Sequence, residues 1–155
     1  MTKTTTTSLK TILCPVDFSP SSEKALIHAA ERYAQHANLV VLHVGHPASG
    51  DHGMLLKEQL HHFSRFSDML SAYDCNIRFA VEYGSPAEVI IRYAKSHHID
   101  LIVLGSHGAN NIPRLLVGST TETVMRQASC QVLVLKSPER ADAVAGVTRQ
   151  NSAVL

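Results

Sequence analysis

The segment of the chain best suited to bind a ligand contains three glycines, the last of them followed by a serine. Two residues separate Gly105 from Gly108, nine separate Gly108 from Gly118, and Ser119 follows directly. Glycine lets a ligand approach the backbone closely. An expected helix start at the end of the segment adds unpaired N–H groups and a dipole that favour an anion. The pattern favours phosphate binding. A purely structural role, in which the glycines only permit tight turns, explains it equally well.

The same segment lacks the two common nucleotide fingerprints, Gly-x-Gly-x-x-Gly and Gly-x-x-x-x-Gly-Lys-[Ser/Thr]. Residues 119–122 read Ser-Thr-Thr-Glu, the form of a capping box in which the serine and glutamate side chains satisfy backbone N–H groups of a starting helix. His107 and Arg114 lie inside the segment and are candidates for phosphate contact. The alternative is that both are ordinary loop residues exposed to solvent. The residues alone therefore predict an anion site of unspecified kind.

The elements around this segment alternate between apolar runs and amphipathic helical patterns. Helices are expected after Ser19-Pro20, over about 56–73, after Ser85-Pro86, and from 119 to about 128. The apolar positions that mark the second of these helices are Leu56, Leu60, Phe63, Phe66, Leu70 and Tyr73. The apolar runs that predict strands are residues 11–16, 39–44, 77–81, 101–104 and 132–135, the third of them near a sheet edge. A polar loop is expected over 45–53.

This alternation predicts an α/β fold, a doubly wound five-stranded parallel sheet with helices on both faces. We expect the strand order 3-2-1-4-5. Ligands of such sheets bind beyond the carboxyl ends of the strands, where the winding direction reverses. Asp17 follows the first strand and Gly105 ends the fourth, so we expect them to face each other across that crevice. A simple helix-capping role is the alternative for Asp17.

Length and composition restrict the function further. The 155 residues suit one domain, 45% are hydrophobic and 17% charged, and the formal net charge is +1. The scattered basic residues argue against nucleic acid or anionic lipid as partners. The polar N-terminus and the lack of an 18-residue apolar stretch predict a soluble cytoplasmic chain without a membrane span. We expect a flexible segment at 1–9, a domain at 10–136 and a tail at 137–155.

Cysteine and histidine could in principle carry other chemistry. Cys14, Cys75 and Cys130 are odd in number and widely spaced, which predicts free structural thiols in a reducing compartment. The adjacent pairs His61-His62 and His97-His98 would point about 100° apart on a helix and so do not form a chelate. No metal site is predicted.

Four motifs along the chain resemble the ATP-binding branch of the universal stress protein family, over a span from about 10 to 136. They are Val16-Asp17-Phe18-Ser19, Leu42-His43-Val44, Gly105-Ser106-His107-Gly108 and the full spacing Gly105-x2-Gly108-x9-Gly118-Ser119. The resemblance implies ribose binding by Asp17 with Gly105, adenine contact with the Val44 backbone, and a base pocket lined by Pro15 and Leu104. The residues it implies for the phosphates are Gly108, Gly118, Ser119 and Thr120.

Two positions depart from the family pattern, since methionine is frequent where Leu104 stands and valine where Thr120 stands. The implied function is ATP binding in a stress-response regulator or sensor without catalytic residues, with AMP or ADP as alternative ligands and Mg²⁺ as a companion of ATP. The implied partners are a second copy, paired through the last strand, and an unidentified regulatory protein.

Two alternatives remain beside that function. An ATP-hydrolysing or nucleotidyl-transfer enzyme would need a phosphate-binding turn after the first strand, where Pro20 lacks an N–H. A dimeric interaction module that binds AMP or no nucleotide would not need the glycines.

Overall fold

The computed structural model describes residues 9–46, 52–106 and 117–136, with only the backbone described for 52–55. All strand pairs are parallel and the sheet order is β3-β2-β1-β4-β5, which confirms the predicted topology. Along the chain the elements are β1 (Thr11–Val16), α1 (Pro20–Arg32), β2 (Asn38–Gly45), α2 (His52–Leu70), β3 (Asn76–Tyr83), α3 (Pro86–Ser96), β4 (Leu101–Gly105), α4 (Ser119–Gln127) and β5 (Gln131–Leu135).

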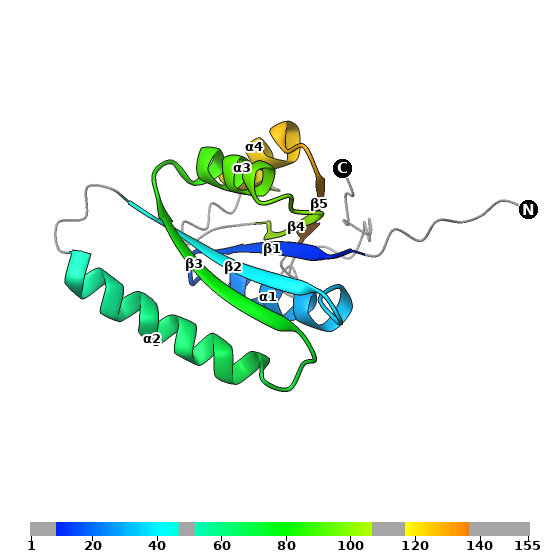
Figure 1. Cartoon of the computed structure of the whole chain (residues 1–155). Coiled ribbons are helices and arrows are strands. Elements are labelled where there is room, and N and C mark those ends of the chain that lie inside the picture. Colours follow the sequence, from blue (N-terminus) through cyan, green and yellow to red (C-terminus); the bar gives the residue numbers. More distant parts are fainter. Residues whose placement is uncertain (1–8, 47–51, 107–116, 137–155) are drawn as a thin grey trace, which may run out of the picture.

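Helices cover both faces of the sheet, α1 and α2 on one side and α3 and α4 on the other (Figure 1). Side chains of a strand alternate between faces, so each strand feeds two hydrophobic clusters. Ile12 and Cys14 of β1 pack on the side of α1 and α2, whereas Leu13 packs on the side of α3 and α4. All three side chains have no exposed surface. None of the described helices is long and apolar enough to cross a membrane.

The central position of β1 follows from its nearly continuous apolar sequence. It pairs with β2 over its whole length, from Thr11 opposite Asn38 to Val16 opposite His43. On its other side it pairs with β4 at Ile12 and Leu13. Strands buried on both faces read as apolar runs. β3 lies at a sheet edge as predicted, and β5 forms the other edge.

The helix starts agree with the sequence at α1 and differ at α4. Ser19 is the N-cap of α1, with Pro20 in the first turn, and its side chain accepts a hydrogen bond from the N–H of Ser22. The predicted capping box at α4 is wrong, because the N-cap is Gly118 and Ser119 is already the first helical residue. Gly118 takes the extended backbone conformation of an N-cap, and its carbonyl accepts from the N–H of Glu122.

The buried side of α2 also differs from the prediction. Its sheet-facing residues are Gln59, Phe63, Phe66 and Leu70, spaced by four, three and four positions. Leu56 and Leu60, expected on that side, are 49% and 56% exposed. The loop expected over 45–53 is shorter, since β2 includes Gly45 and α2 begins at His52. Tyr73 lies beyond the end of α2.

Candidate functional site

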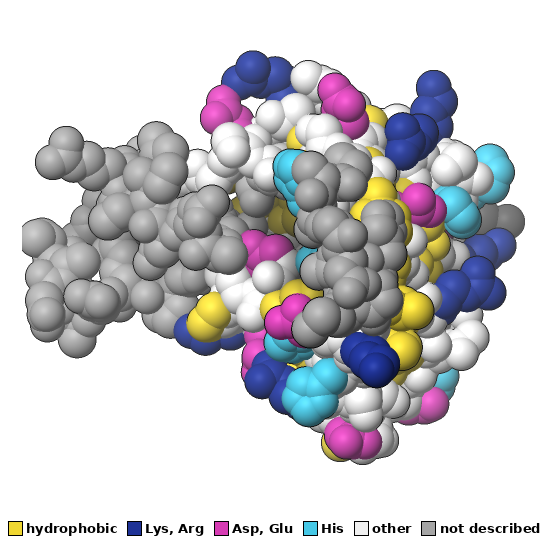
Figure 2. Space-filling model, turned by 90° about the vertical axis from the view of Figure 1, so that its left-hand side faces the viewer, with side chains coloured by type: hydrophobic (Ala, Val, Ile, Leu, Met, Phe, Trp, Pro, Cys, Tyr) yellow, Lys and Arg dark blue, Asp and Glu magenta, His cyan; other side chains and the backbone are white. Residues whose placement is uncertain are grey.

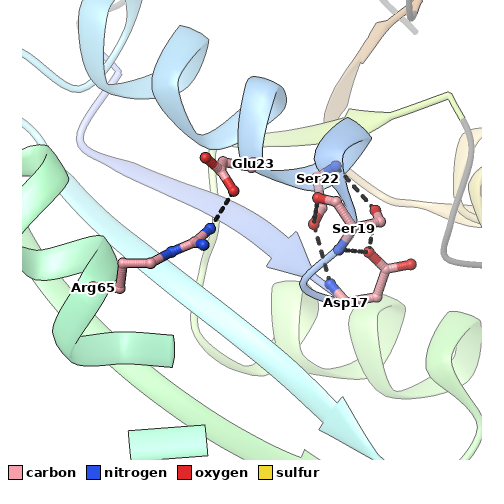
Figure 3. Close-up of polar contacts among 5 residues, drawn as sticks. All are labelled: Asp17, Ser19, Ser22, Glu23 and Arg65. Carbon is pink, nitrogen blue, oxygen red and sulfur yellow. Dashed lines mark hydrogen bonds and ion pairs between the residues drawn. The ribbon is translucent and has the colours of Figure 1, made fainter. Parts of the chain in front are cut away.

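Asp17 begins a tight polar turn between β1 and α1 (Figure 3). One of its carboxylate oxygens, Oδ1, accepts hydrogen bonds from both the N–H and the hydroxyl of Ser19, with an N···O distance of 3.0 Å. The N–H of Asp17 in turn donates to the hydroxyl of Ser22 at 3.4 Å. The Asp17 side chain is nevertheless exposed. It therefore holds the N-cap residue Ser19 in place and is also presented at the carboxyl end of the central strand.

The base-pocket candidates lie on three neighbouring strands, β2, β1 and β4. Val44 and Leu104 both pack with the cluster on the α3 and α4 side. Pro15 has the same parity along β1 as Leu13, which belongs to that cluster, so it faces the same side. Pro15 and Leu104 are buried and Val44 is partly buried. The structure thus brings the three residues to one face near the strand ends.

Gly105 occupies a position where β4 and the first turn of α1 approach closely. A Cβ atom there would lie 2.8 Å from the carbonyl oxygen of Ser21 and 2.9 Å from its carbonyl carbon. The carbonyl of Gly105 accepts a hydrogen bond of 2.9 Å from the hydroxyl of Thr121 on α4. Gly105 therefore joins three elements, and its lack of a side chain is required by packing alone.

The start of α4 is tied to the end of β4 by backbone hydrogen bonds. The N–H of Gly118 donates to the carbonyl of Ser106 at 2.7 Å, and the N–H of Ser106 donates to the carbonyl of Leu135 at 2.8 Å. The backbone N–H predicted to help hold a phosphate at Gly118 is thus already engaged. The N–H groups without a partner inside the helix belong to the next residues, Ser119, Thr120 and Thr121.

Other predicted phosphate residues, Gly108, His107 and Arg114, lie outside the described residues. On the described part of the face where β2 and β3 end, basic and acidic side chains are interspersed (Figure 2). No single sign of charge dominates there, in keeping with the net charge of +1. An anion at this edge would therefore depend on local donors such as the first turn of α4.

Histidines and cysteines of the described part form no cluster of three or more metal-ligating side chains with Asp or Glu. His97 stacks on Tyr93 with ring centroids 3.8 Å apart, and its Nδ1 donates to the Tyr93 carbonyl at 3.0 Å. Burial raises the pKa of the Cys14, Cys75 and Cys130 thiols, which disfavours the reactive thiolate.

Three residues near the site belong to motifs quoted from the sequence but were given no role of their own there: Phe18, His43 and Thr121. The ring of Phe18 lies against His43 of β2, and Nδ1 of His43 donates to the carbonyl of Val16 at 3.0 Å. Val16 and Phe18 flank Asp17. A histidine two residues from the end of β2 gives no signal of such a contact, because it depends on the pairing of β1 with β2.

The model of the universal stress protein family matches residues 8–136. The chain belongs to this family. Universal stress protein MJ0531 of Methanocaldococcus jannaschii is 34% identical over 143 residues, which cover 84% of each chain.

Solved structures of universal stress proteins share the fold. That of MJ0577 from Methanocaldococcus jannaschii superposes with a TM-score of 0.78 at 27% identity, covering 86% of this chain and 99% of that one. A family member from Arabidopsis thaliana with AMP bound has a TM-score of 0.62 at 17% identity, covering 88% of this chain and 97% of that one. At 17% identity the likeness is one of fold.

Proposed function

We propose that this universal stress protein binds ATP at the carboxyl edge of its sheet, with ADP and AMP as weaker or alternative ligands. One observation carries the proposal. An apolar wall and an exposed carboxylate lie at the carboxyl ends of adjacent strands, and a helix N-terminus is hydrogen-bonded to the end of one of them. The wall is Pro15, Val44 and Leu104, the carboxylate is Asp17, and the helix is α4.

Each part suits one part of a nucleotide. An apolar wall suits a purine ring, and a carboxylate suits the vicinal hydroxyls of ribose. The first turn of α4, from Ser119 to Thr121, offers N–H groups and the positive end of the helix dipole to phosphates. Gly105 would assist at the ribose and Gly108 at the phosphates, and Mg²⁺ would accompany ATP. The fold is compatible with such a ligand, since the Arabidopsis thaliana relative was solved with AMP.

Regulation is the role we propose, rather than catalysis. The turn after β1 begins α1 with Pro20, which has no N–H to donate to a transferring phosphate. The hydroxyl of Ser19 donates to Asp17, and the hydroxyl of Ser22 donates to the backbone carbonyl of Ser19. We propose that nucleotide occupancy selects one state of the 105–119 segment, which a regulatory protein in the cytoplasm senses.

A homodimer is part of the proposed function. β5 is an edge strand, and a second copy that pairs with it would cover its outer row of backbone groups.

Calorimetric titration of the purified protein with ATP, ADP and AMP tests the binding proposal. We expect ATP to bind, and Asp17→Asn to weaken it about tenfold or more through loss of charged hydrogen bonds to ribose. Asp68→Asn, an exposed position on α2, is the matched control and should bind as the wild type does. Absence of heat with all three nucleotides would refute the proposal.

Phosphate release separates a regulator from an enzyme. We expect tight binding with no turnover beyond that of the Asp17→Asn variant. Turnover that depends on Asp17 and Mg²⁺ would favour the enzymatic alternative.

A further inference from the structure

Phe18, directly after Asp17, is held in an unusual backbone conformation by rings from two other elements. Its φ is 63°, in the left-handed region that residues other than glycine rarely occupy. Its ring stacks on His62 of α2 with centroids 4.1 Å apart and an interplanar angle of 13°. On another side it contacts His43 of β2, with centroids 4.4 Å apart and an angle of 31°.

These three rings, His43, Phe18 and His62, form what we term the ring clamp. It also contacts the core of α2, because the Phe18 ring lies 6.0 Å from that of Phe63 and 5.9 Å from that of Phe66. The clamp controls the backbone on both sides of Asp17. Phe18 follows that residue, and His43 donates from Nδ1 to the carbonyl of Val16, which precedes it.

A second contact near the clamp links α2 to α1. Arg65, one turn beyond His62 on α2, forms an ion pair with Glu23 in the first turn of α1 (Figure 3). The turn that carries Asp17 lies between β1 and α1, so α2 contacts it through the clamp and contacts its following helix through the ion pair.

We propose that Phe18 is a positioning residue for the ribose-binding carboxylate, and that the ring clamp couples helix α2 to nucleotide affinity. The inference rests on the proposed function, in which Asp17 accepts hydrogen bonds from the ribose hydroxyls. The left-handed conformation of Phe18 turns the chain sharply after β1 and so directs Asp17 to the strand edge. Without the clamp, the turn would relax toward commoner conformations and the carboxylate would lose its orientation.

The test compares ATP with 2′,3′-dideoxy-ATP, which lacks the hydroxyls that Asp17 would bind. Phe18→Leu keeps an apolar side chain but removes the flat ring, and His62→Ala removes one side of the clamp while leaving Phe18 in place. We expect both variants to bind ATP about tenfold more weakly and to bind the dideoxy analogue as the wild type does. Ser64→Ala, at another exposed position on α2, should change neither affinity.

A double-mutant cycle shows whether the effect passes through Asp17. In the Asp17→Asn background, Phe18→Leu should cause no further loss of ATP affinity. By reciprocity, ATP should slow amide hydrogen exchange in α2 of the wild type and not in His62→Ala. Phe18→Tyr keeps the ring, so this variant should match the wild type in ATP affinity and in the slowing of amide exchange in α2.

The outcomes separate the two proposals. Equal losses for ATP and the dideoxy analogue, or no loss for either, would overturn the positioning role while leaving nucleotide binding intact. Failure of the wild type to bind ATP would overturn both. Circular dichroism shows whether each variant is folded. If Phe18→Leu does not fold, His62→Ala tests the proposal in its place.

Discussion

Gly105 is a residue whose missing side chain matters for packing before any ligand is considered. A methyl group there would meet the backbone of Ser21, which cannot rotate away. We expect Gly105→Ala to reduce the free energy of unfolding by about 1–3 kcal/mol, as overpacking does. Urea denaturation measures the loss.

Gly45→Ala provides the matched control at the end of β2. Its added methyl would lie 2.9 Å from Cε1 of Tyr83, a ring atom of a partly exposed side chain that can move. We expect a smaller loss than at Gly105. Equal losses would mean that the backbone of α1 yields as easily as a side chain does.

The thiols offer a second prediction at the scale of residues. Cys14 is fully buried in β1, and burial strongly raises the pKa of its thiol. Cys75 and Cys130 are partly buried, and their thiol pKa values are also raised, chiefly by burial. We expect Cys14 to resist a thiol reagent at mildly alkaline pH until the protein unfolds, while Cys75 and Cys130 react slowly. Fast labelling of Cys14 in the native protein would contradict its buried position.

Helix caps can be compared directly because α1 and α3 both begin with Ser-Pro. The Ser19 side chain accepts from the N–H of Ser22, whereas the Ser85 side chain makes no capping hydrogen bond. We expect Ser19→Ala to lower the free energy of unfolding by about 1 kcal/mol. Ser85→Ala should have little effect. A thermal melt of each variant decides, and a larger loss at Ser85 would contradict the assignment.

Helix α2 carries a polar residue on its buried side. Gln59 is 4% exposed, and its Oε1 has no hydrogen-bond partner among the residues that the structure describes. A buried acceptor without a partner is unfavourable, so Gln59→Leu should raise the free energy of unfolding by about 1 kcal/mol. Gln127→Leu at the exposed end of α4 is the control and should give no gain. A loss of stability in Gln59→Leu would show that the amide forms an interaction in solution.

The same helix shows where sequence reasoning reached its limit. Periodicity identified Phe63, Phe66 and Leu70 correctly, because apolar residues three and four apart share one helix face. It also assigned Leu56 and Leu60 to the core in place of Gln59. Which end of a helix extends past the sheet depends on tertiary placement, and the sequence pattern contains no information on that.

For the whole molecule, the alternation of apolar runs with helices was enough to predict a parallel doubly wound sheet, since crossover connections are right-handed. The expected strand order agrees with the structure, although the alternation alone does not select it among the orders of such sheets. The candidate site was only partly predictable. Pro15, Val44 and Leu104 were named by resemblance, and the structure places them on one face. The ring clamp was not predicted, because it joins residues from three elements and has no local spacing.

Assembly gives the last prediction. Light scattering should give twice the chain mass of 16.9 kDa. Amide exchange in β5 should slow as protein concentration rises, while exchange in β3, the other edge, should not respond. A mass equal to one chain at every concentration would rule out the proposed dimer.

The hydrogen bond between Gly118 and Ser106 closes the chain at the base of the segment between them. Because strand and helix are already held together there, the length of what lies between adds little to the cost of folding, about 0.6 kcal/mol for each doubling. A foreign peptide could accordingly be inserted at this junction without disturbing the sheet.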